Sequence, residues 1–112
     1  MKRWLLLAAL VATSASAHHG WSEYNADKPL QLVGVIEESG YVQPHGFVRL
    51  KTPDKSWTVV LAPPSRMESR GLAKDKLVAG QNATVYGYPH RSKTDELRAE
   101  RITIGDKTTE LR

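Results

Sequence analysis

The chain has 112 residues, no cysteine and a formal net charge of +4. This length leaves room for one domain, and the lack of cysteine excludes disulfides and thiolate metal ligands. The basic surplus is small and dispersed, which argues against nucleic acid as a partner, because nucleic-acid-binding domains usually carry a clustered basic face.

The first 17 residues, MKRWLLLAALVATSASA, have the three parts of a secretory signal peptide. A basic start precedes an apolar run over residues 4–12, and small residues up to Ala17 form a cleavage site. The apolar run is much shorter than the roughly 20 residues of a membrane span. We therefore expect cleavage after Ala17, export to the periplasm without a membrane anchor, and a single domain over residues 18–112.

The mature sequence indicates mainly strands. Leu30, Leu32 and Ile36 alternate with polar residues, which is the two-residue period of a half-buried strand. Gly34 lies inside this strand, where a missing side chain predicts a bulge or a sharp bend. Residues 46–62 then predict two further strands, joined as a hairpin by a turn that contains proline.

A short helix is expected after the hairpin, in the stretch that begins with Pro63 and Pro64. Ser65 and Glu68 have the spacing of a capping box, and Gly71 is a suitable terminator. Further strands are expected near residues 82–88, 97–104 and 108–111. Five or six strands with one helix between the third and the fourth predict a small closed barrel of the OB type. An open sheet or a sandwich is the alternative.

The four histidines are the candidate metal ligands, namely His18, His19, His45 and His90. After cleavage at Ala17, the amine and the ring of His18 can chelate one ion, and His45 or His90 can supply a third nitrogen. Planar nitrogen-rich coordination favours Cu(II). The sequence thus predicts copper as a cofactor, held in a histidine brace. The amine, amide and ring of His19 offer a second geometry, and a frayed, metal-free terminus is the alternative to both.

The aromatic residues suggest a different binding function. Tyr86 and Tyr88 fall on one face of the fourth strand, where such rings can stack on sugars. Their other role is to fill or cover the core. The runner-up function is accordingly a metal-free interaction module that binds an envelope protein or a glycan. We expect the domain to be a monomer.

The sequence shows no sign of catalysis. It contains no nucleophile motif and no glycine-rich phosphate loop. We expect Glu37, Glu38, Glu96 and Glu100 to lie on solvated faces, without pairing that would require acid–base chemistry. The predicted role is therefore binding.

Several of these elements together resemble a family of small exported bacterial domains of unknown function. That family shows Ala-His-His and an aromatic residue at the signal cleavage site, then Gly-x-Val, Asn-Pro-His, a helix that ends near Arg-Gly, and a glycine-bounded strand. The corresponding segments here are Ala17-His18-His19-Gly20-Trp21, Gly34-Val35-Ile36, Gln43-Pro44-His45, residues 64–71 and residues 80–87. Gln43 replaces the usual asparagine. The resemblance implies export and a small β-barrel, and it implies no activity.

Overall fold

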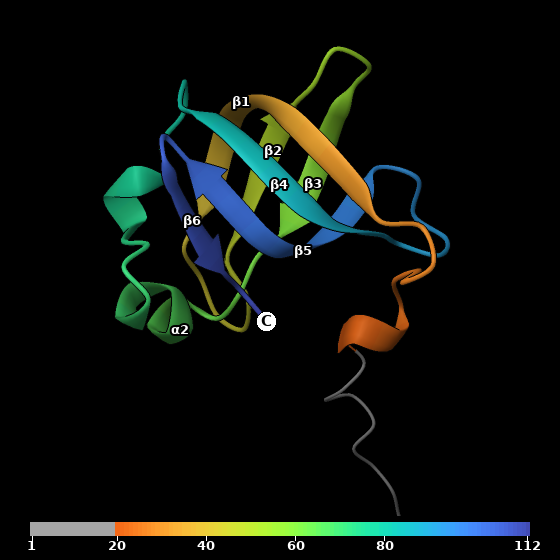
Figure 1. Ribbon diagram of the computed structural model, residues 1–112, viewed down its shortest axis with the longest axis horizontal. Coiled ribbons are helices and arrows are strands. Elements are labelled where there is room, and N and C mark those ends of the chain that lie inside the picture. The colour runs from red at the N-terminus through yellow and green to blue at the C-terminus, as the bar shows by residue number, and fades with distance from the viewer. Residues whose placement is uncertain (1–19) are drawn as a thin grey trace, which may run out of the picture.

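The computed structural model describes residues 20–112, so the predicted signal peptide, His18 and His19 lie outside the described residues. No helix within this part of the chain is long and apolar enough to cross a membrane. The chain forms mainly strands, shown in Figure 1. In order they are β1 (Leu30–Gly40), β2 (Phe47–Lys51), β3 (Ser56–Val60), β4 (Asn82–Pro89), β5 (Glu96–Ile104) and β6 (Lys107–Glu110). Between β3 and β4 lie the helix α2 (Pro64–Ser69) and the short 3-10 helix η1 (Lys74–Lys76).

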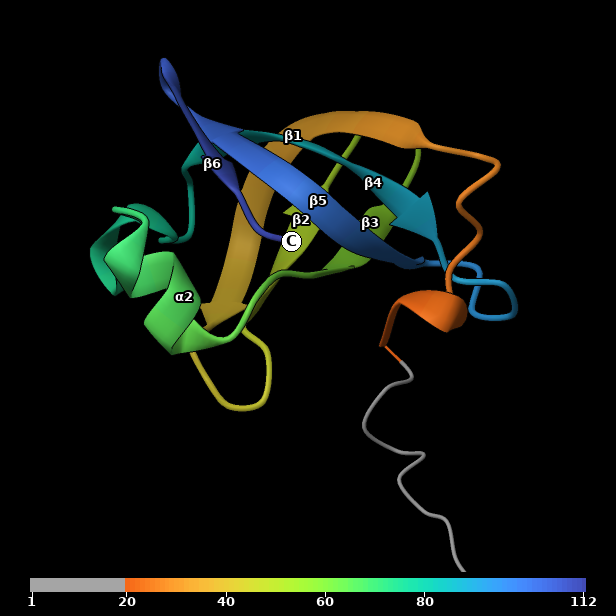
Figure 2. The same cartoon turned by 60° about the horizontal axis from the view of Figure 1, so that its bottom comes forward.

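The strands form one sheet in the order β3-β2-β1-β4-β5-β6. Neighbours in this order are antiparallel, and a parallel pairing of β3 with β5 closes the sheet into a barrel. Five strands thus make the barrel, and β6 adds to the free side of β5 (Figure 2). This topology confirms the predicted closed OB-like barrel with a helix between the third and fourth strands.

The core follows the alternation of the strands. Val48 and Leu50 on β2 are fully buried, as are Val59 on β3 and Ile102 on β5. Met67 of α2 is also fully buried, so the helix covers one end of the barrel with its apolar side. Burial of these side chains supplies the main favourable term for a domain without disulfides.

The bend of β1 differs in detail from the prediction. The bulge lies at Glu37, because Ile36 pairs with Leu50 while Glu38 pairs with the next residue of β2. Gly34 has another role, since a Cβ there would lie 2.2 Å from the carbonyl oxygen of Lys51. Gly34 is thus required by the close approach of two strands, and the extra residue lies further along the strand.

The predicted capping box of α2 is wrong. The N-cap is Pro63, and no side chain caps the amides of the first turn, because the helix begins at Pro64 and Ser65 already lies inside it. The predicted end is correct. Gly71 has φ +87°, its N–H donates to the Glu68 carbonyl, and the N–H of Leu72 donates to the Met67 carbonyl. This pair of bonds is a Schellman motif.

Candidate functional site

His45 lies on the loop between β1 and β2 and contacts an arginine of the barrel. Its Nε2 is 3.3 Å from Nη2 of Arg98. A guanidinium has only donors, so the imidazole nitrogen accepts and the ring hydrogen resides on Nδ1. Burial, followed by the charges of Arg98 and Arg66, lowers the pKa of His45. The ring is therefore neutral at pH 7, with its lone pair directed at a cation.

His90 follows β4 directly and closes the turn toward β5. Its Nδ1 accepts hydrogen bonds from the amides of Ser92 (3.1 Å) and Lys93 (3.0 Å). The ring hydrogen is then on Nε2, which lies 3.6 Å from a carboxylate oxygen of Glu23. Nδ1 of His90 thus holds the turn, while Nε2 faces Glu23 of the N-terminal segment, so the partners of His90 differ from those of His45.

Of the four predicted metal ligands, the structure describes His45 and His90. His18 and His19 lie outside the described residues. Within residues 20–112, no group of three His, Cys, Asp or Glu side chains is arranged to hold a metal ion.

Arg98 of β5 is the residue that sequence reasoning missed. It is only 6% exposed, and its Nε has no hydrogen-bond partner in the described part of the chain. Its guanidinium carbon lies 4.3 Å from the ring centre of Trp21. Burial is the main cause that lowers the pKa of Arg98, with Arg66 and Arg112 acting in the same direction and Tyr24 opposing them. Among the described residues Arg98 forms no ion pair with a carboxylate.

Trp21 contacts two arginines at once. The guanidinium carbon of Arg112 lies 4.4 Å from the same ring centre that Arg98 faces. Tyr88 meets the indole edge-on, with ring centres 6.2 Å apart. In both ribbon views the C-terminal end of the chain lies between α2 and the helical turn at residues 20–22 (Figures 1 and 2). Segments distant in sequence therefore converge at this end of the barrel.

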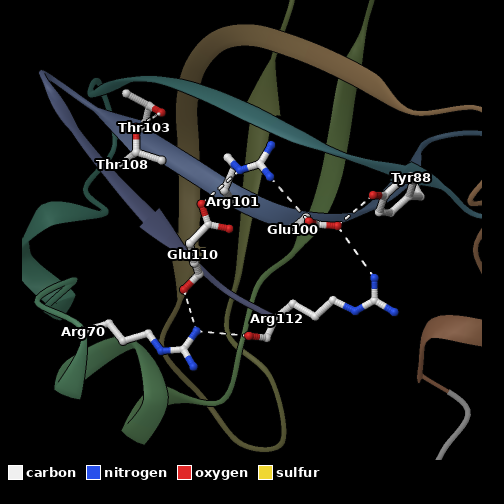
Figure 3. Close-up of polar contacts among 8 residues, drawn as sticks. All are labelled: Arg70, Tyr88, Glu100, Arg101, Thr103, Thr108, Glu110 and Arg112. Atoms are coloured by element: carbon white, nitrogen blue, oxygen red, sulfur yellow. Dashed lines mark hydrogen bonds and ion pairs between the residues drawn. The ribbon is translucent and has the colours of Figure 1, made fainter.

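Glu100 connects Arg112 to the outer face of the sheet, as Figure 3 shows. Its carboxylate accepts a 2.7 Å hydrogen bond from the Tyr88 hydroxyl and lies 3.7 Å from Arg112 and 3.4 Å from Arg101. The expectation that Glu96 and Glu100 lie on solvated faces is wrong. Their side chains are 17% and 22% exposed, and Glu96 accepts a hydrogen bond from Tyr24.

The predicted pair of tyrosines does share one face of β4. The rings of Tyr86 and Tyr88 meet edge-on with centres 6.0 Å apart, while the preceding Val85 is buried on the opposite face. Arg101 covers the ring of Tyr86 at 4.7 Å, much as Arg98 and Arg112 cover Trp21. Arginines thus already lie over the rings of Tyr86 and Trp21, where a sugar would have to stack.

Most of the chain matches one known protein family. Residues 6–98 match a family described as a family of unknown function, DUF6152. The chain belongs to DUF6152. A search of curated proteins finds no match for it.

Solved structures similar to this DUF6152 chain come from TiaS. One is TiaS in complex with tRNA and ATP, with a TM-score of 0.55 and 22% identity over 80% of this chain and 20% of that chain. Another is a ZRD-deleted TiaS mutant in complex with agmatine, with a TM-score of 0.58 and 20% identity over 75% of this chain and 26% of that chain. The DUF6152 chain thus matches about a quarter of TiaS or less. At this identity the likeness shows the fold alone.

Three arginines of this DUF6152 chain, Arg66, Arg98 and Arg112, gather around Trp21 and His45 at one end of the barrel. We refer to Trp21, His45, Arg66, Arg98 and Arg112 together as the Arg98 site. Arg66 donates to the neutral carbonyl of Leu111 at 3.0 Å, and Glu100 is shared between Arg112 and Arg101. Chemically, such an arrangement attracts an anion.

Proposed function

We propose that this DUF6152 protein is exported, begins at His18 in the periplasm, and serves as a binding domain that takes an acidic ligand at the Arg98 site. Envelope proteins and glycans that carry acidic groups are the corresponding natural ligands. The sequence already suggested a metal-free interaction module that binds an envelope protein or a glycan. From the Arg98 site we infer that the group it binds is acidic.

The observation that carries the proposal is the burial of Arg98 without a carboxylate partner within residues 20–112. Removing a charge from water costs several kcal/mol per ion, at the order-of-magnitude level, unless it is paired and hydrogen-bonded. Arg98 has a neutral imidazole, an indole face and an unpartnered Nε instead. An anionic group would supply the missing charge and the missing acceptor.

The same surroundings favour an anion over a metal cation at His45. After burial, the positive charges of Arg98 and Arg66 lower the pKa of His45, and the lone pair of its Nε2 already accepts a hydrogen bond from Arg98. A cation bound there would have to displace this bond and approach two guanidinium charges. An anion meets attraction from the same groups.

The test is calorimetry with the protein purified from the periplasm, titrated with phosphate, sulfate or acetate at constant ionic strength and without metal. We expect saturable binding that Arg98→Met abolishes. Arg101→Met is the matched control, because Arg101 also covers an aromatic ring but pairs with Glu110 at 3.0 Å on the surface. Absence of binding in all three titrations, or equal loss in both variants, would contradict the proposal.

Copper binding through His18 is the second candidate, and one observation favours it. A Cβ on Gly20 would lie 3.0 Å from Nη1 of Arg98, so residue 20 contacts the same guanidinium as His45. Two residues span at most about 7 Å. A chain that begins at His18 would therefore carry its amine within reach of the neutral His45 ring. His90 is a less suitable partner, because its Nδ1 holds the β4–β5 turn and its Nε2 faces Glu23.

The copper candidate has its own test. Intact mass spectrometry of the periplasmic protein gives the first residue and any ion retained. Cu(II) affinity is then compared between protein that begins at His18 and protein with one extra N-terminal residue. Much weaker binding by the longer form supports a brace through the amine, and equal affinities rule that brace out.

A further inference from the structure

Trp21 occupies the position where two incompletely neutralised arginines of the Arg98 site come together. The guanidinium carbons of Arg98 and Arg112 both lie within 4.4 Å of its ring centre. An aromatic face attracts cations through its quadrupole, so the indole partly substitutes for an anion. The inference below rests on the proposed function, since it concerns what happens at that site when a ligand arrives.

We infer that Trp21 closes the Arg98 site, and that a tetrahedral oxyanion of the phosphate or sulfate type displaces it to bridge Arg98 and Arg112. A cation–π contact is weaker than a charge-assisted hydrogen bond between a guanidinium and an oxyanion. The replacement therefore favours the ligand once it is present.

The ligand class follows from the number of donors to be satisfied. Among the residues that the structure describes, Nε of Arg98 is unpartnered, and the one ion pair of the Arg112 guanidinium is the 3.7 Å pair with Glu100, a carboxylate that Arg101 also contacts. A group that replaces the indole must serve both guanidiniums at once. A tetrahedral oxyanion presents more oxygens in more directions than a carboxylate, which favours phosphate or sulfate groups over acetate.

The chain around Trp21 is attached in a way that permits this displacement. Firm main-chain attachment begins after it, where the amide of Asn25 donates to the Pro89 carbonyl at 2.8 Å and that of Arg91 donates to the Glu23 carbonyl at 2.9 Å. Within the described residues, no main-chain hydrogen bond joins Gly20 or Trp21 to a strand. Trp21 can thus leave its place without opening the barrel.

The experiment uses the fluorescence of Trp21 in the periplasmic protein. That protein, if cleaved at Ala17, keeps two tryptophans, Trp21 and Trp57. Trp57 is 8% exposed and belongs to the core, so it serves as an internal reference. We expect phosphate and sulfate, but not chloride, to change the indole emission, and we expect Trp21→Phe to lack this change because its remaining indole is the one in the core. Glucose 6-phosphate and vesicles with anionic headgroups, as further titrants, separate free phosphate from sugar and lipid sources.

A second variant tests the displacement without fluorescence. Trp21→Leu removes the competing aromatic face, so calorimetry should show phosphate binding about five-fold tighter, which corresponds to about 1 kcal/mol. Weaker binding by Trp21→Leu, or binding by the wild type with unchanged emission, would overturn the displacement and leave the proposed function standing. If no oxyanion binds to either protein, the proposed function itself fails.

Discussion

The Tyr88 hydroxyl donates a 2.7 Å hydrogen bond to Glu100, and Glu100 is the bulged residue of β5. In the β4–β5 ladder Tyr86 pairs with Arg101 while Gly87 pairs with Ala99, so no residue of β4 lies opposite Glu100. A bulge re-aims a side chain relative to the regular alternation. Here Glu100 contacts Tyr88, Arg101 and Arg112 together (Figure 3).

Tyr88 should titrate late because of this bond. The hydrogen bond to Glu100, followed by burial, raises the pKa of Tyr88 to about 12. The unfolded chain loses this proton near pH 10 while the folded protein keeps it, so the free energy of unfolding should fall as the pH rises from about 10 to 12. Burial and the hydrogen bond to Glu96 also raise the pKa of Tyr24. The ultraviolet titration of the wild type should therefore contain one more late phenol than that of Tyr88→Phe, and Glu100→Gln should shift that phenol back toward pH 10. A normal titration of Tyr88 in the wild type would refute the assignment.

Two glycines should tolerate no side chain. A Cβ on Gly87 would lie 2.1 Å from the Arg98 carbonyl oxygen, and one on Gly34 would lie 2.2 Å from that of Lys51. Because both obstacles are main-chain atoms, Gly34→Ala and Gly87→Ala should each destabilise the fold by about 3 kcal/mol or more in chemical denaturation.

Gly105→Ala is the control for these variants. Gly105 has φ +64°, and a Cβ on it would meet nothing within 4 Å, so only its left-handed backbone opposes the change. The expected cost is about 1–2 kcal/mol. If Gly87→Ala costs no more than Gly105→Ala, strand contact is not what requires the glycine.

Arg98→Met should separate stability from binding. Replacing a buried, incompletely paired charge by an apolar side chain of similar length is often neutral or stabilising, by about 1–4 kcal/mol. We therefore expect an unchanged or higher free energy of unfolding in a variant that no longer binds oxyanions. A large loss of stability would instead mean that Arg98 holds the fold together.

The loss of stability on truncating an apolar side chain to alanine should depend on how deeply that side chain is buried. Leu50 is fully buried, so Leu50→Ala should lower the free energy of unfolding by about 2–5 kcal/mol. Val33 on the outer face of β1 is 59% exposed, and Val33→Ala should change it by about 0.5 kcal/mol or less. Similar losses in the two variants would argue against the inward and outward faces described above.

The strands were predictable because alternation records which face of each strand is buried. β5 also carried a signal for its bulge. Leu97 and Ala99 point inward before Glu100, and Ile102 is the next buried residue after it, so the spacing of buried residues changes from two to three at the bulge. The position of the bulge in β1 was predicted wrongly, because a glycine inside a strand can mark a close approach instead of an extra residue.

The Arg98 site could not be predicted in the same way. Alternation places Arg98 opposite Leu97 and Ala99, which is the outward face of β5. It is buried because Trp21, distant in sequence, lies over that face. Periodicity reports contacts within a sheet and says nothing of a segment that packs onto it from outside. The two loop histidines had no periodicity to indicate their partners either.

The parallel seam that closes the barrel is short, and it includes the arginine of the proposed site. Thr58, Val59 and Val60 pair there with Glu96, Leu97 and Arg98. A ligand bound to Arg98 would therefore stabilise the parallel pairing of β3 with β5, which closes the barrel. Binding of a ligand to Arg98 should thus slow the exchange of the β3 amides with solvent.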